Sequence, residues 1–408
     1  MTTTTNNEQK KLNVPNKREQ NQSCLDSAER EGLRPNGNVP NLRFPEFRGE
    51  WEKVRLGEEC NMLCGYAFNG EDIVEQGSYL LMRGINITEG SIRHSSELDR
   101  YYSGSIEKLD KYKLAIGDLV IGMDGSKVGR NSAIVSSYED GSYLVQRVCR
   151  IRSSIGNNYI LQFINNTKFH QYVDTVKTSS AIPHISLRDI KNYRISIPST
   201  QDETDKIAKL FLLLDERIAT QNKIIDKLQS LIKGITQKIV RSNKPNVRLS
   251  ECLECKSSTL QESEVCEQGT YPVYGANGIV GYLDNYNTEG EAVYIIKDGS
   301  GVGTVSYVTG KCSATGTLNT LQAKDGYSLQ YLYYLLKVFN FEPYKTGMAI
   351  PHIYFKDYGK AKFFCPSYTE QLQYAQSLSA IDSKLLVEKN ILTNLTLQKQ
   401  YLLRQMFI

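Results

Sequence analysis

The clearest pattern in the chain is a run of apolar positions within residues 201–242, spaced alternately by four and three. This alternation is the seam of a heptad coiled coil, because it keeps one stripe of a helix apolar. Thr200 with Glu203 reads as a capping box at its start, and Pro245 excludes helix beyond its end. The seam consists of Ile207, Phe211, Leu214, Ile218, Gln221, Ile225, Leu228, Ile232, Ile235 and Ile239.

The same pattern returns at residues 367–408, again after a capping box, formed here by Ser367 and Glu370. Gln221 and Glu388 occupy equivalent places, so each seam carries one polar residue, which fixes register and partner choice. An ordinary core helix is the alternative for any apolar heptad. Because neither stripe can be buried alone, we expect an antiparallel coiled coil. The second seam consists of Tyr374, Leu378, Ile381, Leu385, Glu388, Leu392, Leu395, Lys399, Leu402 and Met406.

The stretches outside the helices form two divergent copies of one globular unit. VRLGE at 54–58 returns as VRLSE at 247–251, and AIPHI returns at 181–185 and 349–353. Short β-rich runs alternate with glycine turns, which predicts α/β (α+β) units with modest sheets and a pseudo-two-fold internal repeat. The expected organisation is a disordered polar tail (1–38), a first domain (39–199), a central long helix (200–244), a second domain (245–366) and a C-terminal long helix (367–408).

The copies differ most between Gly84 and Asp124, where the first unit is longer and includes the polar stretch RHSSELDRYYSGSIEKLDKY. By this internal comparison, the segments that both copies share are framework. The segments that differ are where the two units can perform different tasks.

Composition narrows the class of protein. The chain has 408 residues, 40% of them hydrophobic and 23% charged, with a net charge of +4, values that are ordinary for a globular protein. It contains no apolar run long enough to span a bilayer and no signal-peptide pattern, so we expect a cytoplasmic location. Cys252 and Cys255 form a CxxC without a second pair at suitable spacing, so no metal site is expected.

Catalytic motifs are not evident. GSGVG at 299–303 follows a strand, but Thr304 replaces the third glycine of a dinucleotide-binding motif. No P-loop, nucleophile elbow, zinc-protease or kinase motif occurs. His184 and His352 are duplicated in the AIPHI segments, which favours a framework role, while a stand-alone enzyme using them stays an alternative. We expect no catalytic residues.

The glycine-rich motif DGSxVG occurs twice, at 124–129 and 298–303. Glycines let a backbone approach a ligand closely, and successive amides can hold a phosphate. A plain hairpin turn explains the motif equally well.

The order of unit, helix, unit, helix resembles the specificity subunit of type I restriction-modification enzymes. The resemblance covers residue 39 onward and rests on LRFPEF with Trp51, the VRLGE and VRLSE strings, the AIPHI junctions and the two helices ending in LLRQMF. It implies that each unit is a target-recognition domain for one half of a bipartite, asymmetric site on double-stranded DNA. It also implies that the helices fix the spacing and dock two methyltransferase (modification) subunits.

The resemblance further implies that this chain binds no cofactor and is not itself an enzyme. S-adenosylmethionine, ATP and Mg would belong to the methyltransferase and to the restriction or motor subunits. An alternative is a two-domain nucleic-acid-binding adaptor of another machine. The candidate DNA-binding residues lie where the copies differ or beside the glycine turns, and a solvated surface residue is the competing interpretation for each. They are Arg83, Lys127, Arg130, Arg147, Asn277, Lys297, Ser300 and Lys311.

Overall fold

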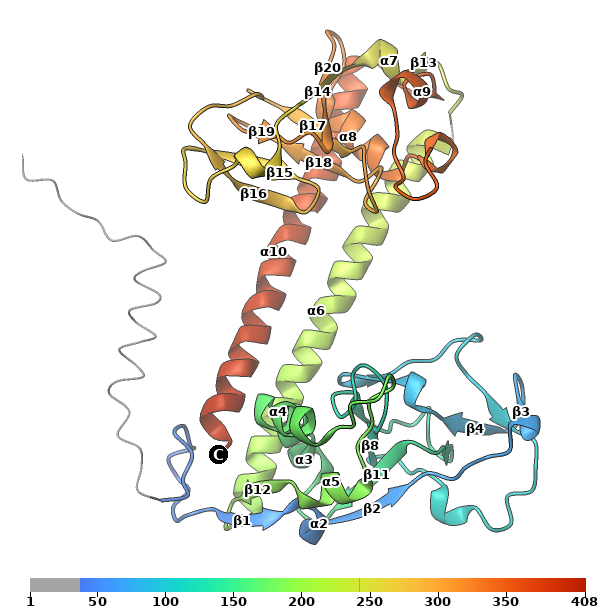
Figure 1. The fold of residues 1–408 in the computed structure, drawn as a ribbon, viewed down its shortest axis with the longest axis vertical. Helices are drawn as coiled ribbons and strands as arrows, with labels where there is room; N and C mark the ends of the chain where they lie inside the picture. Colours follow the sequence, from blue (N-terminus) through green and yellow to red (C-terminus); the bar gives the residue numbers. More distant parts are fainter. Residues whose placement is uncertain (1–36, 242) are drawn as a thin grey trace, which may run out of the picture. The chain divides into compact units, whose positions relative to one another are not determined.

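The computed structural model describes residues 37–241 and 243–408. They form two compact units: the first contains residues up to Asp215 together with Leu397–Ile408, and the second contains Glu216–Thr396. Each unit mixes small sheets and short helices (Figure 1), which is the expected α/β (α+β) class. The tail expected at residues 1–38 lies outside the described residues, apart from its last two positions.

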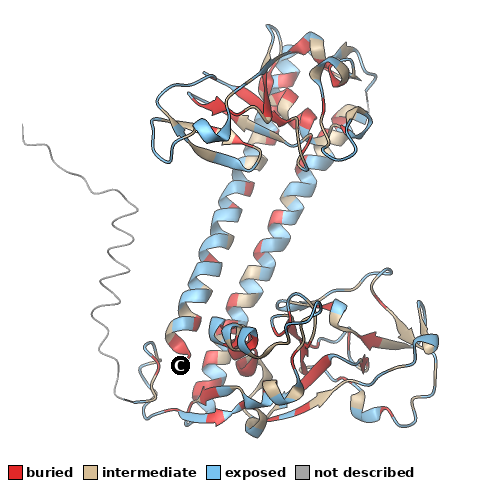
Figure 2. Cartoon of the chain, viewed as in Figure 1, coloured by how far each residue is buried: buried red, intermediate tan, exposed pale blue. Residues whose placement is uncertain are grey.

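Two long helices belong to both units: α6 (Gln201–Arg241) and α10 (Tyr368–Met406). All residues of both seams are buried or half-buried, while the positions between them are largely exposed (Figure 2). The heptad prediction is therefore confirmed. The seams hold together because burying aliphatic side chains removes apolar surface from water.

The two helices run antiparallel in each unit. In the second unit the Gln221 side-chain amide donates a hydrogen bond to the backbone oxygen of Glu388 at 3.0 Å and also contacts its carboxylate. In the first unit Lys399 Nζ lies 2.5 Å from Asp215 Oδ1. Early residues of α6 thus meet late residues of α10, as expected from the two matched polar positions.

One expected cap is confirmed and the other is wrong. Ser367 Oγ donates to Glu370 Oε2 at 2.6 Å, and the Glu370 amide faces Ser367 Oγ, so α10 begins with a capping box. At the start of α6 the Glu203 carboxylate is fully buried and accepts two hydrogen bonds from Arg43, at 2.6 and 2.7 Å. Glu203 therefore anchors the segment that precedes β1 instead of capping the helix.

In the first unit, the central sheet is antiparallel with order β2-β11-β8-β9. A second sheet has order β10-β4-β7-β3, with β10 and β4 parallel. The strands are β1 (Glu52–Arg55), β2 (Cys60–Cys64), β3 (Ile73–Val74), β4 (Tyr79–Met82), β5 (Ile87–Thr88), β6 (Ser91–Ile92), β7 (Tyr101–Tyr102), β8 (Leu119–Gly122), β9 (Ser132–Ile134), β10 (Tyr143–Leu144), β11 (Val148–Ser153) and β12 (Arg194–Ile197). The helices are α2 (Leu56–Glu59), α3 (Asn157–Ile164), α4 (Thr167–Val176) and α5 (Leu187–Asn192).

The second unit repeats this plan. Its antiparallel sheet has order β14-β20-β17-β18, and the smaller sheet has order β16-β15-β19, with β15 and β19 parallel. The strands are β13 (Val247–Arg248), β14 (Leu253–Ser257), β15 (Tyr271–Gly275), β16 (Gly278–Leu283), β17 (Ala292–Ile296), β18 (Val305–Val308), β19 (Ser313–Ala314), β20 (Leu318–Ala323) and β21 (Lys362–Phe363). The helices are α7 (Leu249–Cys252), α8 (Leu329–Val338) and α9 (Phe355–Tyr358).

The correspondence between the units is strand by strand. The pair β1–β12 matches β13–β21, and the parallel pair β4–β10 matches β15–β19. The units differ in the connection between two paired strands, which is β4 to β7 in the first unit and β15 to β16 in the second. Ala276 and Asn277 alone make the connection in the second unit, whereas residues 83–100 make it in the first and include the β5–β6 hairpin. We call residues 83–100 the insert.

The hydrophobic core of each unit includes the adjoining part of the long helices. In the first unit Phe211 and Phe407 pack with their ring centroids 5.5 Å apart, and Phe407 also contacts Tyr159 and Phe163. In the second unit Ile239 and Ala375 join the core around Leu332. Within the described ranges, no helix combines the length and the hydropathy required to cross a membrane.

Candidate nucleic-acid interface

In the first unit, the glycine turn between β8 and β9 lies against the AIPHI loop. Asp124 and His184 form an isolated antiparallel bridge. The Gly125 amide donates to the Pro183 carbonyl at 3.0 Å, and the Ile185 amide donates to the Met123 carbonyl at 3.0 Å. Two segments about sixty residues apart are thus joined at one end of the sheet.

The second unit joins the equivalent segments through equivalent atoms. Asp298 bridges His352, and the Gly299 amide donates to the Pro351 carbonyl at 2.9 Å. The Ile353 amide donates to the Lys297 carbonyl at 2.9 Å. The pairing of glycine turn and AIPHI loop is therefore a property of the repeated fold.

The glycines are explained by backbone conformation and packing. Gly129 and Gly303 have φ angles of 72° and 91°, in the left-handed region that favours glycine. A Cβ at Gly129 would lie 2.8 Å from Val173 Cγ2, and one at Gly303 would lie 2.9 Å from Phe341 Cδ2. Each glycine is thus required both by its turn and by the helix or loop behind it.

The turn amides are largely occupied within the fold. In the first unit the amide of Val128 donates to the Gly125 carbonyl, that of Gly129 to the Gly122 carbonyl and that of Arg130 to the Lys127 carbonyl. Amides that already donate to carbonyls cannot converge on a phosphate. The hairpin-turn interpretation of DGSxVG is therefore the one that the geometry favours, and side chains must make most contacts to a ligand.

The two duplicated histidines stabilise their loops. His184 Nδ1 lies 3.0 Å from Thr178 Oγ1, and the Thr178 amide donates to the His184 carbonyl at 3.0 Å. His352 Nδ1 lies 3.1 Å from the Ile350 carbonyl, and the Thr346 amide donates to the His352 carbonyl at 2.9 Å. These contacts close each loop on itself, which supports a framework role for both side chains.

Between these closures each loop exposes an isoleucine. Ile182 is 66% exposed and Ile350 is 65% exposed, at equivalent positions of the two copies. Met348 is also fully exposed in the second loop. These side chains were missed from the sequence, because the AIPHI segments were interpreted as framework only. An isoleucine between a small residue and a proline in a loop was a usable signal of an exposed apolar side chain.

In the first unit, Lys127 and Arg130 lie on the glycine turn and both are exposed. Lys127 Nζ is 3.0 Å from Glu89 Oε1 of the insert, and Arg130 Nη2 is 3.1 Å from Asp174 Oδ2 of α4. Exposed ion pairs of this kind contribute little to stability. Both cations can therefore exchange their carboxylate partners for phosphates at small cost.

Arg83 and Arg147 differ in accessibility. The Arg83 guanidinium is partly buried and donates to the Leu98 carbonyl. Burial lowers the pKa of Arg83, and the nearby positive charge of Arg100 lowers it further. Arg147 is exposed and has a φ of 68°, in the left-handed region. Its carbonyl accepts from the Met123 amide at 2.9 Å, which places Arg147 beside the glycine turn.

In the second unit, Lys297 and Ser300 lie on the glycine turn that meets the AIPHI loop. Asn277 is exposed at the β15–β16 turn, and Lys311 precedes β19. The Lys311 ammonium lies 4.7 Å from the Tyr286 ring centroid, and Tyr286 raises its pKa. The structure thus brings Lys297 and Ser300 to one turn and leaves Asn277 and Lys311 with the smaller sheet.

The insert begins beside the glycine turn of the first unit. A Cβ at Gly84 would lie 3.4 Å from Asp124 Oδ1, and Glu89 forms an isolated bridge with Ser132 of β9. Ile85 and Arg93 are exposed, and Arg93 Nη2 donates to the Ile85 carbonyl at 3.1 Å. Both were missed in the sequence, where Arg93 was one basic residue in a polar run.

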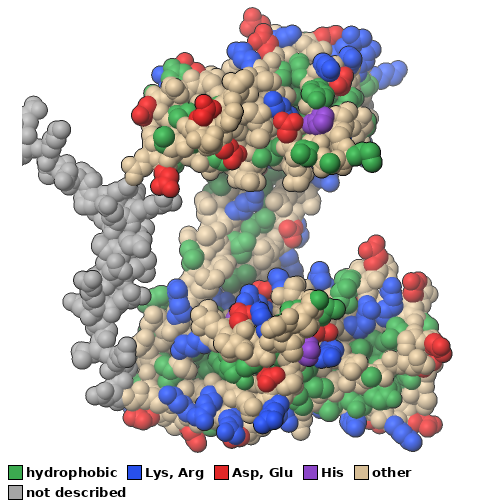
Figure 3. All heavy atoms as spheres, in the orientation of Figure 1, with side chains coloured by type: hydrophobic (Ala, Val, Ile, Leu, Met, Phe, Trp, Pro, Cys, Tyr) green, Lys and Arg blue, Asp and Glu red, His purple; other side chains and the backbone are tan. Residues whose placement is uncertain are grey.

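The visible face of each unit carries basic and hydrophobic side chains next to one another (Figure 3). This mixture suits a surface that contacts both phosphates and the apolar parts of bases.

The amino-acid sequence matches the model of the type I restriction modification DNA specificity domain over residues 48–230 and again over residues 242–397. Together these matches cover more than half of the chain. The chain belongs to this family.

Two curated proteins with similar sequences carry specificity-subunit names. The chain is 29% identical over 179 residues to the type I restriction enzyme EcoAI specificity subunit of Escherichia coli, which is 43% of this chain and 29% of that protein. It is 25% identical over 258 residues to a Mycoplasma genitalium protein described as a type I specificity subunit, which is 58% of this chain and 67% of that protein. The match thus spans less than a third of the E. coli subunit.

The fold has a solved counterpart. The crystal structure of the type I restriction-modification S subunit from M. genitalium superposes with a TM-score of 0.65 at 18% sequence identity, covering 91% of this chain and 99% of that one. At this identity the likeness concerns the fold, and it supports the arrangement of two repeated units with paired long helices.

Proposed function

We propose that this chain is the DNA-specificity subunit of a type I restriction-modification complex, with each unit reading one half of a bipartite, asymmetric site. The observation that carries the proposal is the double match to the DNA specificity domain, one match for each unit. Two repeats of one fold suit the approximate two-fold symmetry of a duplex. The insert makes the two readers unequal, so the two half-sites differ.

The work of recognition divides among the side chains around the glycine turns. Lys127, Arg130 and Lys297 are placed to contact phosphates, which gives affinity that is independent of sequence and weakens with salt. Discrimination between bases falls to the exposed ends of Arg147, Ser300 and the AIPHI isoleucines, because base edges are read by hydrogen bonds and by apolar contact with thymine methyl groups.

The long helices would serve two further tasks, setting the spacing between the half-sites and docking two methyltransferase subunits. Several apolar residues on the outer faces of the helices are exposed, beyond what the paired seams bury. In the second unit they are Ile224, Leu231, Leu372, Leu386, Val387 and Ile391. Apolar residues exposed at helical spacing suit helix packing with a partner.

Catalysis would belong to the partner subunits, so the chain itself would bind no cofactor. S-adenosylmethionine would be held by the methyltransferase subunits, and ATP with Mg by the restriction or motor subunits. The roles found here for His184 and His352, which close their own loops, support this division.

The test is to purify the chain together with its methyltransferase subunits and to map methylated adenines on genomic DNA. We expect methylation at one asymmetric site made of two unequal half-sites with a constant gap. A complex that methylates without sequence preference, or that binds RNA and unrelated DNA equally well at moderate salt, would contradict the proposal and favour a general nucleic-acid adaptor.

A further inference from the structure

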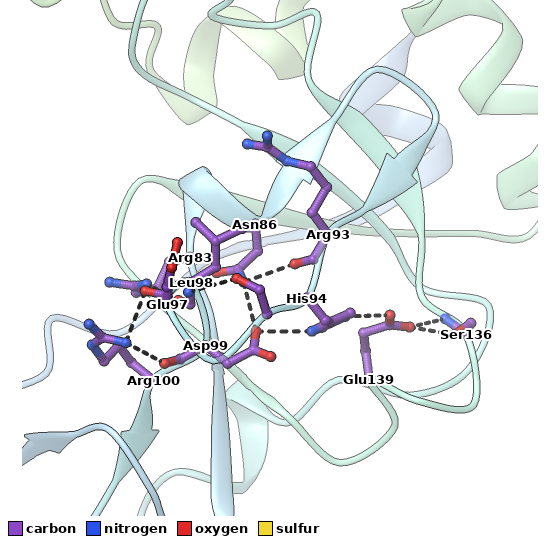
Figure 4. A network of polar contacts seen from close by, with 11 residues as sticks. Arg83, Asn86, Arg93, His94, Glu97, Leu98, Asp99, Arg100, Ser136 and Glu139 are labelled. Carbon is purple, nitrogen blue, oxygen red and sulfur yellow. Dashed lines mark hydrogen bonds and ion pairs between the residues drawn. The ribbon is translucent and has the colours of Figure 1, made fainter. Parts of the chain in front are cut away.

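The insert is attached to the rest of the first unit by a buried polar network centred on His94 (Figure 4). His94 Nδ1 lies 3.0 Å from Asp99 Oδ1, and His94 Nε2 lies 2.8 Å from Glu139 Oε1. Asp99 belongs to the insert, whereas Glu139 belongs to the turn after β9. The imidazole therefore links the insert to the scaffold.

The two carboxylates determine the protonation state that this geometry requires. Asp99 is 6% exposed and Glu139 is 4% exposed, and an ionised carboxylate only accepts hydrogen bonds. An imidazole ring donates from both nitrogens only when it carries both protons. The neutral ring would leave one nitrogen lone pair facing a carboxylate oxygen across a short distance.

Each of the two carboxylates has further hydrogen-bond donors. Asn86 Nδ2 donates to Asp99 Oδ1 at 3.1 Å. The Ser136 amide and hydroxyl donate to Glu139 Oε2 at 2.7 and 2.6 Å. Burial opposes ionisation of Glu139, but the hydrogen bonds from Ser136 and His94 outweigh it and lower the pKa of this carboxyl.

Charged groups surround the network. The Arg83 guanidinium is close enough to Asp99 for the two charges to interact. Tyr138 packs on the ring, with centroids 4.3 Å apart. The remaining charged or titratable groups at this place are Glu75, Arg100 and Tyr101, with Arg100 Nη2 3.7 Å from Glu75 Oε1.

The His94 ring borders an open pocket of about 530 Å³, lined also by Ser95, Tyr101 and Tyr138. In the described part of the chain, no three His, Cys, Asp or Glu side chains are arranged to hold a metal ion.

The network leads directly to the exposed part of the insert. Asn86 is buried, and its side chain donates to the Arg93 carbonyl at 3.2 Å, while the Arg93 amide donates to the Asn86 carbonyl at 2.8 Å. Arg93 in turn holds the Ile85 carbonyl. The position of Ile85 and Arg93 beside the glycine turn therefore depends on the contacts that fix Asp99 and His94.

We infer that His94 is a positioning residue for one half-site: its contacts with Asp99 and Glu139 fix the insert, so that the first unit reads its half-site well only while this link is intact. The inference rests on the proposed function. In the second unit Ala276 and Asn277 stand in place of the insert, so its half-site is read independently of His94.

The experiment uses the complete complex with methyltransferase subunits and three DNA duplexes, carrying the mapped site intact, with the first half-site scrambled or with the second half-site scrambled. Kd is measured for each at constant pH and salt. The variants are His94→Gln, which is uncharged, and Glu139→Gln, which removes one acceptor charge. His170→Gln is the control, because His170 lies on α4 of the same unit, outside the network.

The wild type should discriminate the intact site from both scrambled duplexes. In His94→Gln, discrimination at the first half-site should fall about tenfold, because buried partners of the network lose their hydrogen bonds, and Glu139→Gln should weaken it less. Discrimination at the second half-site should stay constant in both variants. His170→Gln should behave as the wild type does.

A general loss of stability would weaken binding at both half-sites of His94→Gln. Equal losses at the two half-sites, or unchanged discrimination at the first half-site of His94→Gln, would overturn the inference while leaving sequence-specific binding intact. A wild-type complex that ignores scrambling of both half-sites would instead overturn the proposed function.

Discussion

The two units share a scaffold and differ most in one connection. In the second unit Ala276 and Asn277 join β15 to β16, while in the first unit the insert joins β4 to β7 and brings a hairpin, a buried polar network and two exposed residues, Ile85 and Arg93. The glycine turn and AIPHI loop are paired by the same hydrogen bonds in both. This contrast shows that the two copies keep the pairing of glycine turn and AIPHI loop, and that their largest difference lies in the connection beside it.

The largest expected effect tests whether both units depend equally on the paired helices. Phe211→Ala in the first unit and Leu378→Ala in the second each remove a fully buried side chain. Each should lower the free energy of unfolding by about 3–5 kcal/mol, through lost transfer energy and a cavity. Denaturant melts followed by tryptophan fluorescence report on the first unit, because Trp51 lies in its core. A loss below about 1 kcal/mol would show that the helix seams are not well packed.

A second pair of variants tests whether the glycine turns are equivalent. Gly129→Ala and Gly303→Ala combine a left-handed backbone with a steric clash, so each should cost about 2–3 kcal/mol of stability. Gly125→Ala and Gly299→Ala are matched controls with positive φ and open space around the new methyl group, and each should cost about 1 kcal/mol. Equal costs for crowded and open sites, measured by thermal unfolding, would contradict the packing argument.

A smaller effect would sharpen the comparison at the DNA surface. Ile182→Ser and Ile350→Ser should leave the free energy of unfolding unchanged within about 0.5 kcal/mol, because both side chains are exposed. Each should weaken binding of its own half-site by about 1 kcal/mol, or roughly fivefold. Competition with duplexes scrambled in one half-site measures this. A loss of partner-subunit binding with normal DNA binding would assign the isoleucines to a protein interface instead.

The smallest effect concerns phosphates. Lys127→Ala and Lys297→Ala should weaken binding to specific and unrelated DNA alike, by less than about 1 kcal/mol. The slope of log K against log salt should fall by about 1 for each lysine that contacts a phosphate. A change in base preference with an unchanged salt slope would mean that the lysine reads a base edge.

The sequence allowed the long helices and the repeat to be predicted, because both depend on patterns between residues close together in the chain. A seam of alternating fours and threes marks a buried stripe whatever its partner, and Gln221 and Glu388 could be matched by position alone. The cap at Glu203 was mispredicted because Arg43, distant in the sequence, claims that carboxylate. Tertiary contacts of this kind leave no local signal.

The candidate site was harder to predict for the same reason. Lys297 and Ser300 were found through the glycine turns, which are local motifs. The contact between His94 and Glu139 joins residues that no spacing rule relates, and the exposure of Ile182 and Ile350 depends on how the loops close.

The first unit depends on residues that are synthesised after the second unit. Its core includes Phe407, and Asn166 Nδ2 donates to the Leu403 carbonyl at 3.2 Å, so residues 397–408 complete a core whose other residues precede Glu216. During synthesis the apolar surface that packs on Phe407 therefore stays uncovered while the second unit is made. Chaperones that shield nascent chains would have a longer task at the first unit than at the second.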